Sequence, residues 1–156
     1  MMRALWMTQD LVNQIVADAH QERPNEVCGL IVGKGEHATH VIPVANVHTQ
    51  PTHYFRMDPV ALAQHLPALD RQGLSLLGFY HSHPNGDPIP SETDIRDATY
   101  HDTAYVIASV KDGVPRLAAW LINNGRVQPL TLHIGAVASQ DTSEVVPLSK
   151  AQRYAL

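Results

Sequence analysis

Residues 81–94 place two histidines, a serine and an aspartate at spacings that restrict how this part of the chain can fold. His81 and His83 follow the mostly apolar run 74–80, which has the length and composition of a buried strand. Because side chains two residues apart on a strand point to the same face, both imidazoles can bind one metal ion. Ser82, between them, then points to the opposite face.

A stiff turn and a helix are predicted directly after this strand. Pro84 ends the strand, and residues 85–90 contain an Asn-Gly pair and two more prolines. A helix then begins near Ser91, and Asp94 lies three residues further along the same helical face. From the first turn of this helix, Asp94 can reach back to the two histidines. Three protein ligands leave one position for water, which is typical of a catalytic zinc site.

Each part of this pattern also has a simpler interpretation. Ser91 and Asp94 are typical of a helix N-cap followed by an acidic residue in the first turn. A pair of histidines two residues apart also occurs on exposed strand edges without any metal. The combination of same-face histidines, a strand stop, a rigid turn and an acid on the next helix favours the metal site.

The pattern His81-x-His83-Pro84, then six residues, then Ser91-x-x-Asp94 resembles the metal-binding signature of the JAMM metalloproteases. This family is also called the MPN-plus or Mov34/PAD-1 family. The resemblance extends over most of residues 8–135 in the order of the predicted elements. It implies one Zn²⁺ per chain, held by His81, His83 and Asp94.

The family also carries a glutamate at the opening of an upstream strand, and Glu26 stands at that position before the apolar run 27–33. Taken alone, a glutamate at a strand opening is usually a solvated residue. The resemblance implies that Glu26 is the general base. It also implies that Ser91 donates a hydrogen bond to the oxyanion of the tetrahedral intermediate.

The resemblance implies a zinc-dependent peptidase or isopeptidase acting on a small ubiquitin-like or sulfur-carrier protein. Such an enzyme would hydrolyse the bond after the carrier's C-terminal glycine, releasing cysteine or a short peptide. In eukaryotic deubiquitinating relatives, insertions near residues 46–58 and after the catalytic helix help to grip ubiquitin, and this chain has little room for them. Its shortness resembles the bacterial branch, which includes peptidases that release cysteine from a sulfur carrier.

Two other functions compete with this one. The family contains metal-free scaffolds that bind proteins, and a fold does not fix a function. Two histidines and a carboxylate also make a non-haem iron site. Retention of all five signature positions argues against the scaffold, and the match at Glu26 favours hydrolysis over iron chemistry. Zinc deaminases are excluded because the chain has no Pro-Cys-x-x-Cys segment.

Composition narrows the class of protein further. The chain has 156 residues, 44% of them apolar, which suits one globular domain. A net charge of −4, without a run of Lys or Arg, argues against nucleic-acid or membrane-surface binding. Cys28 is the only cysteine and is interpreted as a small residue in a buried strand. Without a signal peptide or an apolar stretch of roughly 20 residues, a soluble cytoplasmic protein is expected.

The order of predicted elements indicates an α/β fold. A helix over 9–22, capped by Thr8 or Asp10, precedes a hairpin of strands over 27–44. A second helix starts at Asp58-Pro59, and Pro67 should kink or split it. After the metal segment come strands over 106–110, 116–122 and 127–134. We expect one JAMM/MPN, cytidine-deaminase-like domain over 1–135, a curved mixed sheet flanked by helices, followed by a C-terminal tail over 136–156.

Overall fold

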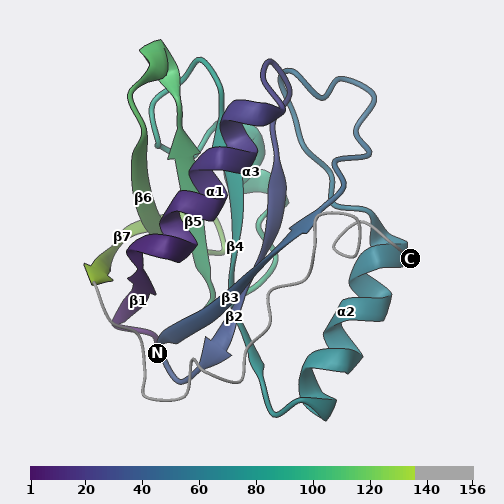
Figure 1. Ribbon diagram of the computed structural model, residues 1–156, viewed down its shortest axis with the longest axis vertical. Helices are drawn as coiled ribbons and strands as arrows, with labels where there is room; N and C mark the ends of the chain where they lie inside the picture. The colour runs from purple at the N-terminus through teal and green to yellow at the C-terminus, as the bar shows by residue number, and fades with distance from the viewer. Residues whose placement is uncertain (136–156) are drawn as a thin grey trace.

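The computed structural model describes residues 1–135, which form one strongly curved sheet and three α-helices (Figure 1). The predicted tail, 136–156, lies outside the described residues. The helices are α1 (Gln9–Gln21), α2 (Pro59–Arg71) and α3 (Glu92–Asp97). The strands are β1 (Ala4–Thr8), β2 (Cys28–Lys34), β3 (His37–Val44), β4 (Ser75–His83), β5 (Ala104–Ser109), β6 (Arg116–Asn123) and β7 (Arg126–Gly135).

The sheet is mixed, as predicted, and it closes into a barrel in the order β1-β3-β2-β4-β5-β6-β7. Strand β4, at the centre of this order, runs antiparallel to β2 and parallel to β5. Strand β1 closes the barrel by pairing in parallel with β7 at five positions and with β3 at one. The sequence did not indicate β1, because five residues that run straight into a helix cap are too short to show a clear period.

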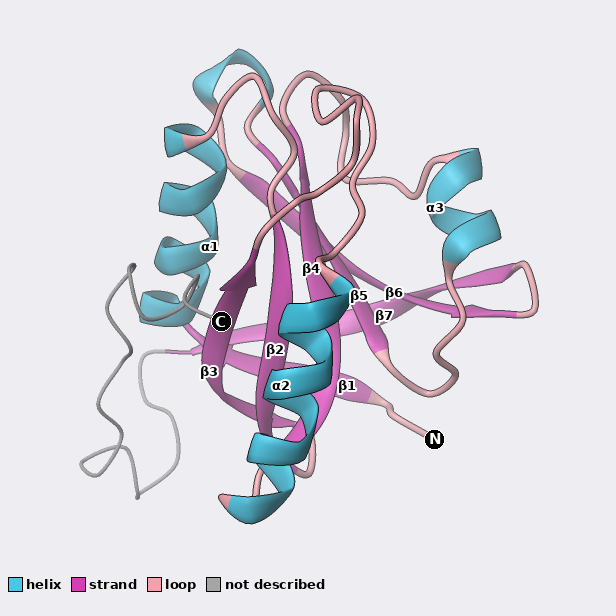
Figure 2. Ribbon diagram, turned by 90° about the vertical axis from the view of Figure 1, so that its right-hand side faces the viewer, coloured by secondary structure: helices cyan, strands magenta, loops and turns pink. Residues whose placement is uncertain are grey.

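Helix α1 begins and packs as its pattern predicts. The Thr8 side chain accepts a hydrogen bond from the Leu11 backbone N–H and caps the helix. Its apolar face packs with one face of the sheet in the larger of two core clusters, and Ile15 and Ala19 are completely buried there. Figure 2 shows α1 and α2 beside different parts of the sheet, with α3 set off to one side.

Helix α2 runs unbroken from Pro59 to Arg71, so the predicted split at Pro67 does not occur. A proline inside a helix removes one hydrogen bond and its ring crowds the carbonyl four residues earlier, so packing must offset this cost. Ala61 and Leu69 are buried on either side of Pro67, in a second core cluster with apolar residues of β2, β3 and β4. Both halves of the helix are therefore held against the sheet.

Gly29 of β2, a strand that leads to the candidate site, has no room for a side chain. A Cβ added to Gly29 would lie 2.4 Å from the Tyr80 ring and 2.5 Å from the Ile42 carbonyl oxygen. We expect Gly29→Ala to lower the free energy of unfolding by about 1–3 kcal/mol, because one of these groups must move. Urea unfolding would measure this loss.

The matched control is Gly86→Ala, where the nearest atom to the added Cβ is 3.6 Å away. This variant should stay within about 0.5 kcal/mol of the wild type. Equal unfolding free energies for the two variants would contradict the tight packing at Gly29.

Candidate metal centre

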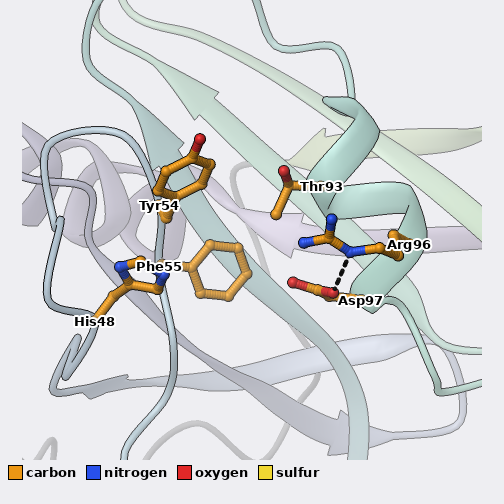
Figure 3. A pocket seen from close by; sticks show the side chains of 6 residues that line it. All are labelled: His48, Tyr54, Phe55, Thr93, Arg96 and Asp97. Atoms are coloured by element: carbon orange, nitrogen blue, oxygen red, sulfur yellow. Dashed lines mark hydrogen bonds and ion pairs between the residues drawn. The ribbon is translucent and has the colours of Figure 1, made fainter.

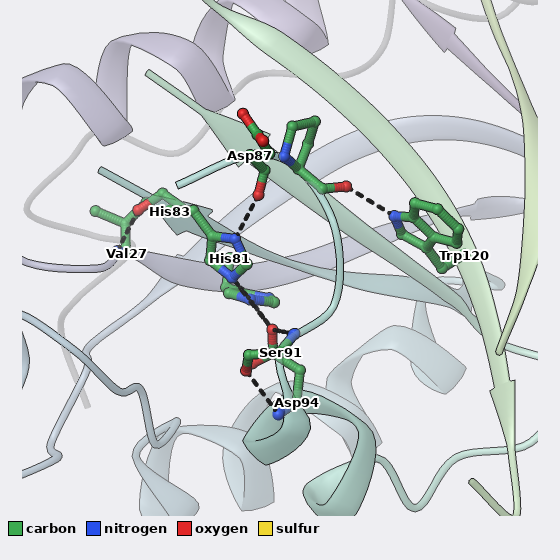
Figure 4. A network of polar contacts seen from close by, with 9 residues as sticks. Val27, His81, His83, Asp87, Ser91, Asp94 and Trp120 are labelled. Carbon is green, nitrogen blue, oxygen red and sulfur yellow. Dashed lines mark hydrogen bonds and ion pairs between the residues drawn. The ribbon is translucent and has the colours of Figure 1, made fainter. Parts of the chain in front are cut away.

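Strand β4 delivers both histidines to one place, as its alternation predicts. His81 pairs in register with Cys28 of β2 and Ile107 of β5, and His83 pairs with Ser109 of β5. The two imidazole Nε2 atoms lie 3.1 Å apart (Figure 4). The side chains of His81 and His83 are only 5% and 13% exposed, so both sit in a largely dry environment.

The turn after β4 is fastened to the neighbouring strands. The Ser109 hydroxyl donates to the Gly86 carbonyl at 2.6 Å, and the Trp120 indole N–H donates to the Pro88 carbonyl at 3.0 Å. Figure 4 shows the Trp120 contact reaching the turn from β6. Nothing in the sequence pattern marks Ser109 or Trp120, because both meet the turn only through the tertiary fold.

Helix α3 starts with a capping box that also orients the Asp94 carboxylate toward the two histidines. Ser91 Oγ accepts from the Asp94 backbone N–H at 3.1 Å, and the Ser91 N–H donates to Asp94 Oδ2 at 2.9 Å. The simple interpretation of this pair as a helix cap is therefore confirmed. The same Oδ2 atom lies 3.1 Å from Nε2 of His81 and 3.1 Å from Nε2 of His83. Asp94 therefore caps the helix and also faces both histidines.

The three converging atoms suit a metal ion in both spacing and chemistry. Zinc–ligand bonds of about 2.0–2.1 Å in a tetrahedral site place the ligand atoms about 3.3 Å apart, close to the three distances of 3.1 Å found here. His83 Nδ1 bonds the Asp87 carbonyl at 2.7 Å and must be the donor, because a carbonyl only accepts. In the neutral imidazole, His83 Nε2 then carries a lone pair that points at Asp94, and a cation between them would satisfy both atoms.

Glu26 lies beside this group, just before β2, and is only 8% exposed. A carboxylate oxygen of Glu26 and one ring nitrogen each of His81 and His83 lie within 4.8 Å of one another. Glu26, His81 and His83 therefore form a group that could hold a metal ion. The site thus offers two carboxylates, Asp94 and Glu26, beside the histidine pair.

The two carboxylates differ in their readiness to lose a proton. Burial raises the pKa of Glu26 to about 7; the nearby Asp94 charge adds to the rise and His83 opposes it. Burial also disfavours the charged form of Asp94, but hydrogen bonds from His81, His83 and the Ser91 N–H outweigh it and hold the pKa well below its usual range. Near neutral pH, Asp94 is ionised, whereas Glu26 exchanges a proton readily.

The pKa values of the two histidines are shifted in opposite directions. Burial lowers the pKa of His81 more than its hydrogen bond to Asp94 raises it. Burial also lowers the pKa of His83, but hydrogen bonds to Asp94 and to the Asp87 carbonyl outweigh this effect, so the pKa of His83 is raised. A neutral His81 is the form that can coordinate a metal.

A pocket opens next to the histidines, between α3 and the connection 46–58 (Figure 3). The Phe55 ring lines it and also stacks on the His81 ring at a centroid distance of 4.4 Å. The Phe55 ring therefore lies between the pocket and His81 of the metal centre. Its lining residues are His48, Tyr54, Phe55, Thr93, Arg96 and Asp97.

The prediction for Cys28 is also confirmed. Cys28 is fully buried and its thiol donates to the Val44 carbonyl at 3.3 Å. Among residues 1–135, every helix is too short or too polar to cross a bilayer.

The protein is therefore an α/β protein with a candidate metal centre. Two histidines lie on one face of β4 in the curved mixed sheet, and an aspartate follows on the next helix. Residues 8–123 match the family described as prokaryotic homologs of the JAB domain, and the chain belongs to this family. The predicted JAMM/MPN family and fold are therefore confirmed.

Three curated relatives carry names that describe a reaction. The chain is 41% identical over 122 residues to a probable TtuB-protein conjugate cleaving protease of Thermus thermophilus, covering 78% of each chain. It is 34% identical to a desampylase of Haloferax volcanii, covering 67% of this chain and 80% of that one. It is also 34% identical to a CysO-cysteine peptidase of Mycobacterium tuberculosis, covering 66% of this chain and 71% of that one.

Solved structures share the fold. A protein of Desulfitobacterium hafniense with 27% identity superposes with a TM-score of 0.79, over 90% of this chain and 99% of that one. A JAB1/MPN domain protein of Archaeoglobus fulgidus, 18% identical, superposes with a TM-score of 0.54, over 83% of this chain and 97% of that one. At that identity, the second likeness shows the fold alone.

Proposed function

We propose that this protein is a zinc-dependent peptidase or isopeptidase. It would hydrolyse the bond after the C-terminal glycine of a small ubiquitin-like or sulfur-carrier protein. The observation that carries the proposal is the meeting of two imidazole nitrogens and a carboxylate oxygen at 3.1 Å from one another, with a second, protonatable carboxylate beside them. Relatives named for cleaving a TtuB-protein conjugate and for a CysO-cysteine peptidase support the choice of substrate.

We assign His81, His83 and Asp94 as the ligands, and Glu26 as the general base. Asp94 Oδ2 is at ligand-to-ligand spacing from both histidines, and the Ser91 N–H holds it there. A ligand must be deprotonated, as Asp94 is, whereas a base must exchange a proton near the working pH. Two carboxylates with pKa values moved in opposite directions fit this division of roles.

When bound, zinc would lower the pKa of a water molecule and polarise the substrate carbonyl. Glu26 would accept the proton from the attacking water and return it to the departing amine. Ser91 Oγ uses one lone pair to accept from the Asp94 N–H, so its hydroxyl proton remains available for the substrate oxyanion. The narrow C-terminal tail of the carrier would lie in the pocket between Phe55 and α3.

The first test of this function is intact-mass spectrometry of a sulfur-carrier protein that bears a C-terminal cysteine or short peptide. Incubation with the zinc-loaded chain should yield a product that ends at the terminal glycine. An uncleaved carrier, with one zinc bound per chain, would contradict the proposed substrate class. A chain that binds no metal would instead favour a protein-binding scaffold.

Ser91→Ala should lower kcat by about 10²–10³-fold, because one hydrogen bond to the oxyanion is lost. Zinc content should be unchanged, since the contact that aims Asp94 comes from the backbone N–H of residue 91. Metal analysis and cleavage rates on the same preparation would check both parts. A variant that loses zinc would show that Ser91 acts only through the helix cap.

A further inference from the structure

The connection between β3 and α2 closes on itself at its base. Asn46 and Met57 form an isolated antiparallel bridge. The Val47 N–H donates to the Arg56 carbonyl at 2.8 Å, and the Asp58 N–H donates to the Ala45 carbonyl at 3.1 Å. We call residues 46–57 the Asn46 loop; a loop with adjoining ends, fixed by its own contacts, is a compact unit.

The side chain of Asn46 ties this loop together and connects it to the candidate site. Its Nδ2 group donates to the Glu26 carbonyl at 2.9 Å and to the Tyr54 carbonyl at 3.0 Å. Its Oδ1 atom accepts from the N–H groups of His48 and Arg56, both at 3.0 Å. An asparagine amide has two donor hydrogens and two acceptor lone pairs, and Asn46 uses all four.

The loop fixes Glu26 from both sides of its Cα atom. The Glu26 N–H donates to the Pro51 carbonyl at 2.8 Å, and the Glu26 carbonyl accepts from Asn46. The same Asn46 amide holds the backbone at Tyr54, whose side chain lines the pocket. One side chain therefore links the backbone of the proposed base to the wall of the pocket.

We propose that Asn46 is a positioning residue that fixes Glu26 relative to the pocket in which the substrate tail lies. This role rests on the proposed peptidase function. Aspartate has the same shape but would turn both donors into acceptors facing the carbonyls of Glu26 and Tyr54. Asn46→Asp therefore breaks the link while leaving the three proposed metal ligands, on β4 and α3, untouched.

Ser82 provides a comparison, because it holds the same segment from strand β4 and not from the loop. Its fully buried hydroxyl accepts from the Val27 N–H at 2.8 Å, next to Glu26 in the chain. Ser82→Ala should therefore loosen Glu26 and leave the pocket wall in place. The two variants separate the placement of the base from the shape of the pocket.

Amide hydrogen exchange of the full chain tests the link without relying on activity. In Asn46→Asp, the N–H groups of His48 and Arg56 keep their acceptor, but the contacts to the Glu26 and Tyr54 carbonyls are lost. The loop should then separate from Glu26, whose N–H donates to Pro51 of the loop, so exchange at the Glu26 amide should speed up by about ten-fold or more, since a lost hydrogen bond contributes on the order of a ten-fold factor. Asn13→Asp is the matched control, because Asn13 is exposed on α1 and accepts a hydrogen bond from Gln9 of the same helix. Unchanged exchange at the Glu26 amide of Asn46→Asp would overturn the proposal.

Steady-state cleavage of the carrier gives the second readout. Asn46→Asp should lower kcat by about 10²-fold, the effect of a misplacement of about 1 Å, and also raise KM. Ser82→Ala should lower kcat and leave KM unchanged, and both variants should keep the wild-type zinc content. A rise in KM with normal kcat in Asn46→Asp would overturn the positioning role alone. An inactive wild type would overturn the proposed function and this role with it.

Discussion

Glu26→Gln is expected to keep one zinc per chain and to lose about 10²–10⁴-fold in kcat, the usual contribution of a general base. The substitution preserves the size and burial of the side chain, so the contacts of its backbone with Pro51 and Asn46 should remain. It removes only the ability to accept a proton. The loss should therefore appear in turnover and leave metal content and folding unaffected.

Intact-mass cleavage assays and metal analysis of the same samples would check this result. Glu92→Gln is a suitable control, because Glu92 is exposed on α3 and the change of chemistry is identical. Its turnover should match that of the wild type. Normal turnover in Glu26→Gln would remove Glu26 from the mechanism, and a loss of zinc would make it a ligand instead.

The sequence was most informative where a local rule sets the geometry. Two histidines two residues apart on a strand must share a face, and the structure brings their Nε2 atoms to 3.1 Å. A serine three residues before an aspartate at a helix start makes a capping box, which also points Asp94 toward the strand that precedes it. The fold class followed from the alternation of helices and strands together with the family resemblance.

Residues whose role depends on distant partners could not be found in this way. Strand β1 is defined by its pairing with β7, more than a hundred residues away in the chain. Asn46 looks like any loop asparagine until the fold brings Glu26 to its amide. Phe55 likewise becomes part of the site only by stacking on His81. The predicted split of α2 at Pro67 was wrong, because buried residues on both sides of the proline hold the helix against the sheet, whereas nothing in the local sequence indicates that packing.

Asp94→Asn should abolish stable zinc binding, with an affinity loss of about 100-fold or more and activity reduced to background. Removing a group that merely orients a ligand already costs about 10–100-fold in metal affinity, and loss of a ligand charge should cost more. The new amide oxygen can still accept from the Ser91 N–H, so the start of α3 should persist. A loss of zinc would then reflect coordination and not an unfolded helix.

Zinc per chain after dialysis against a graded series of chelator concentrations would measure this loss. Asp70→Asn, an exposed change on α2, should retain zinc like the wild type. Together, Asp94→Asn and Glu26→Gln decide which of the two carboxylates beside His81 and His83 binds the metal. The variant of a ligand should lose zinc, and the variant of a base should keep it. If Asp94→Asn kept zinc while Glu26→Gln lost it, Glu26 would complete the metal site. The proton of the attacking water would then have to go to another group, and Asp94 would be the nearest carboxylate to receive it.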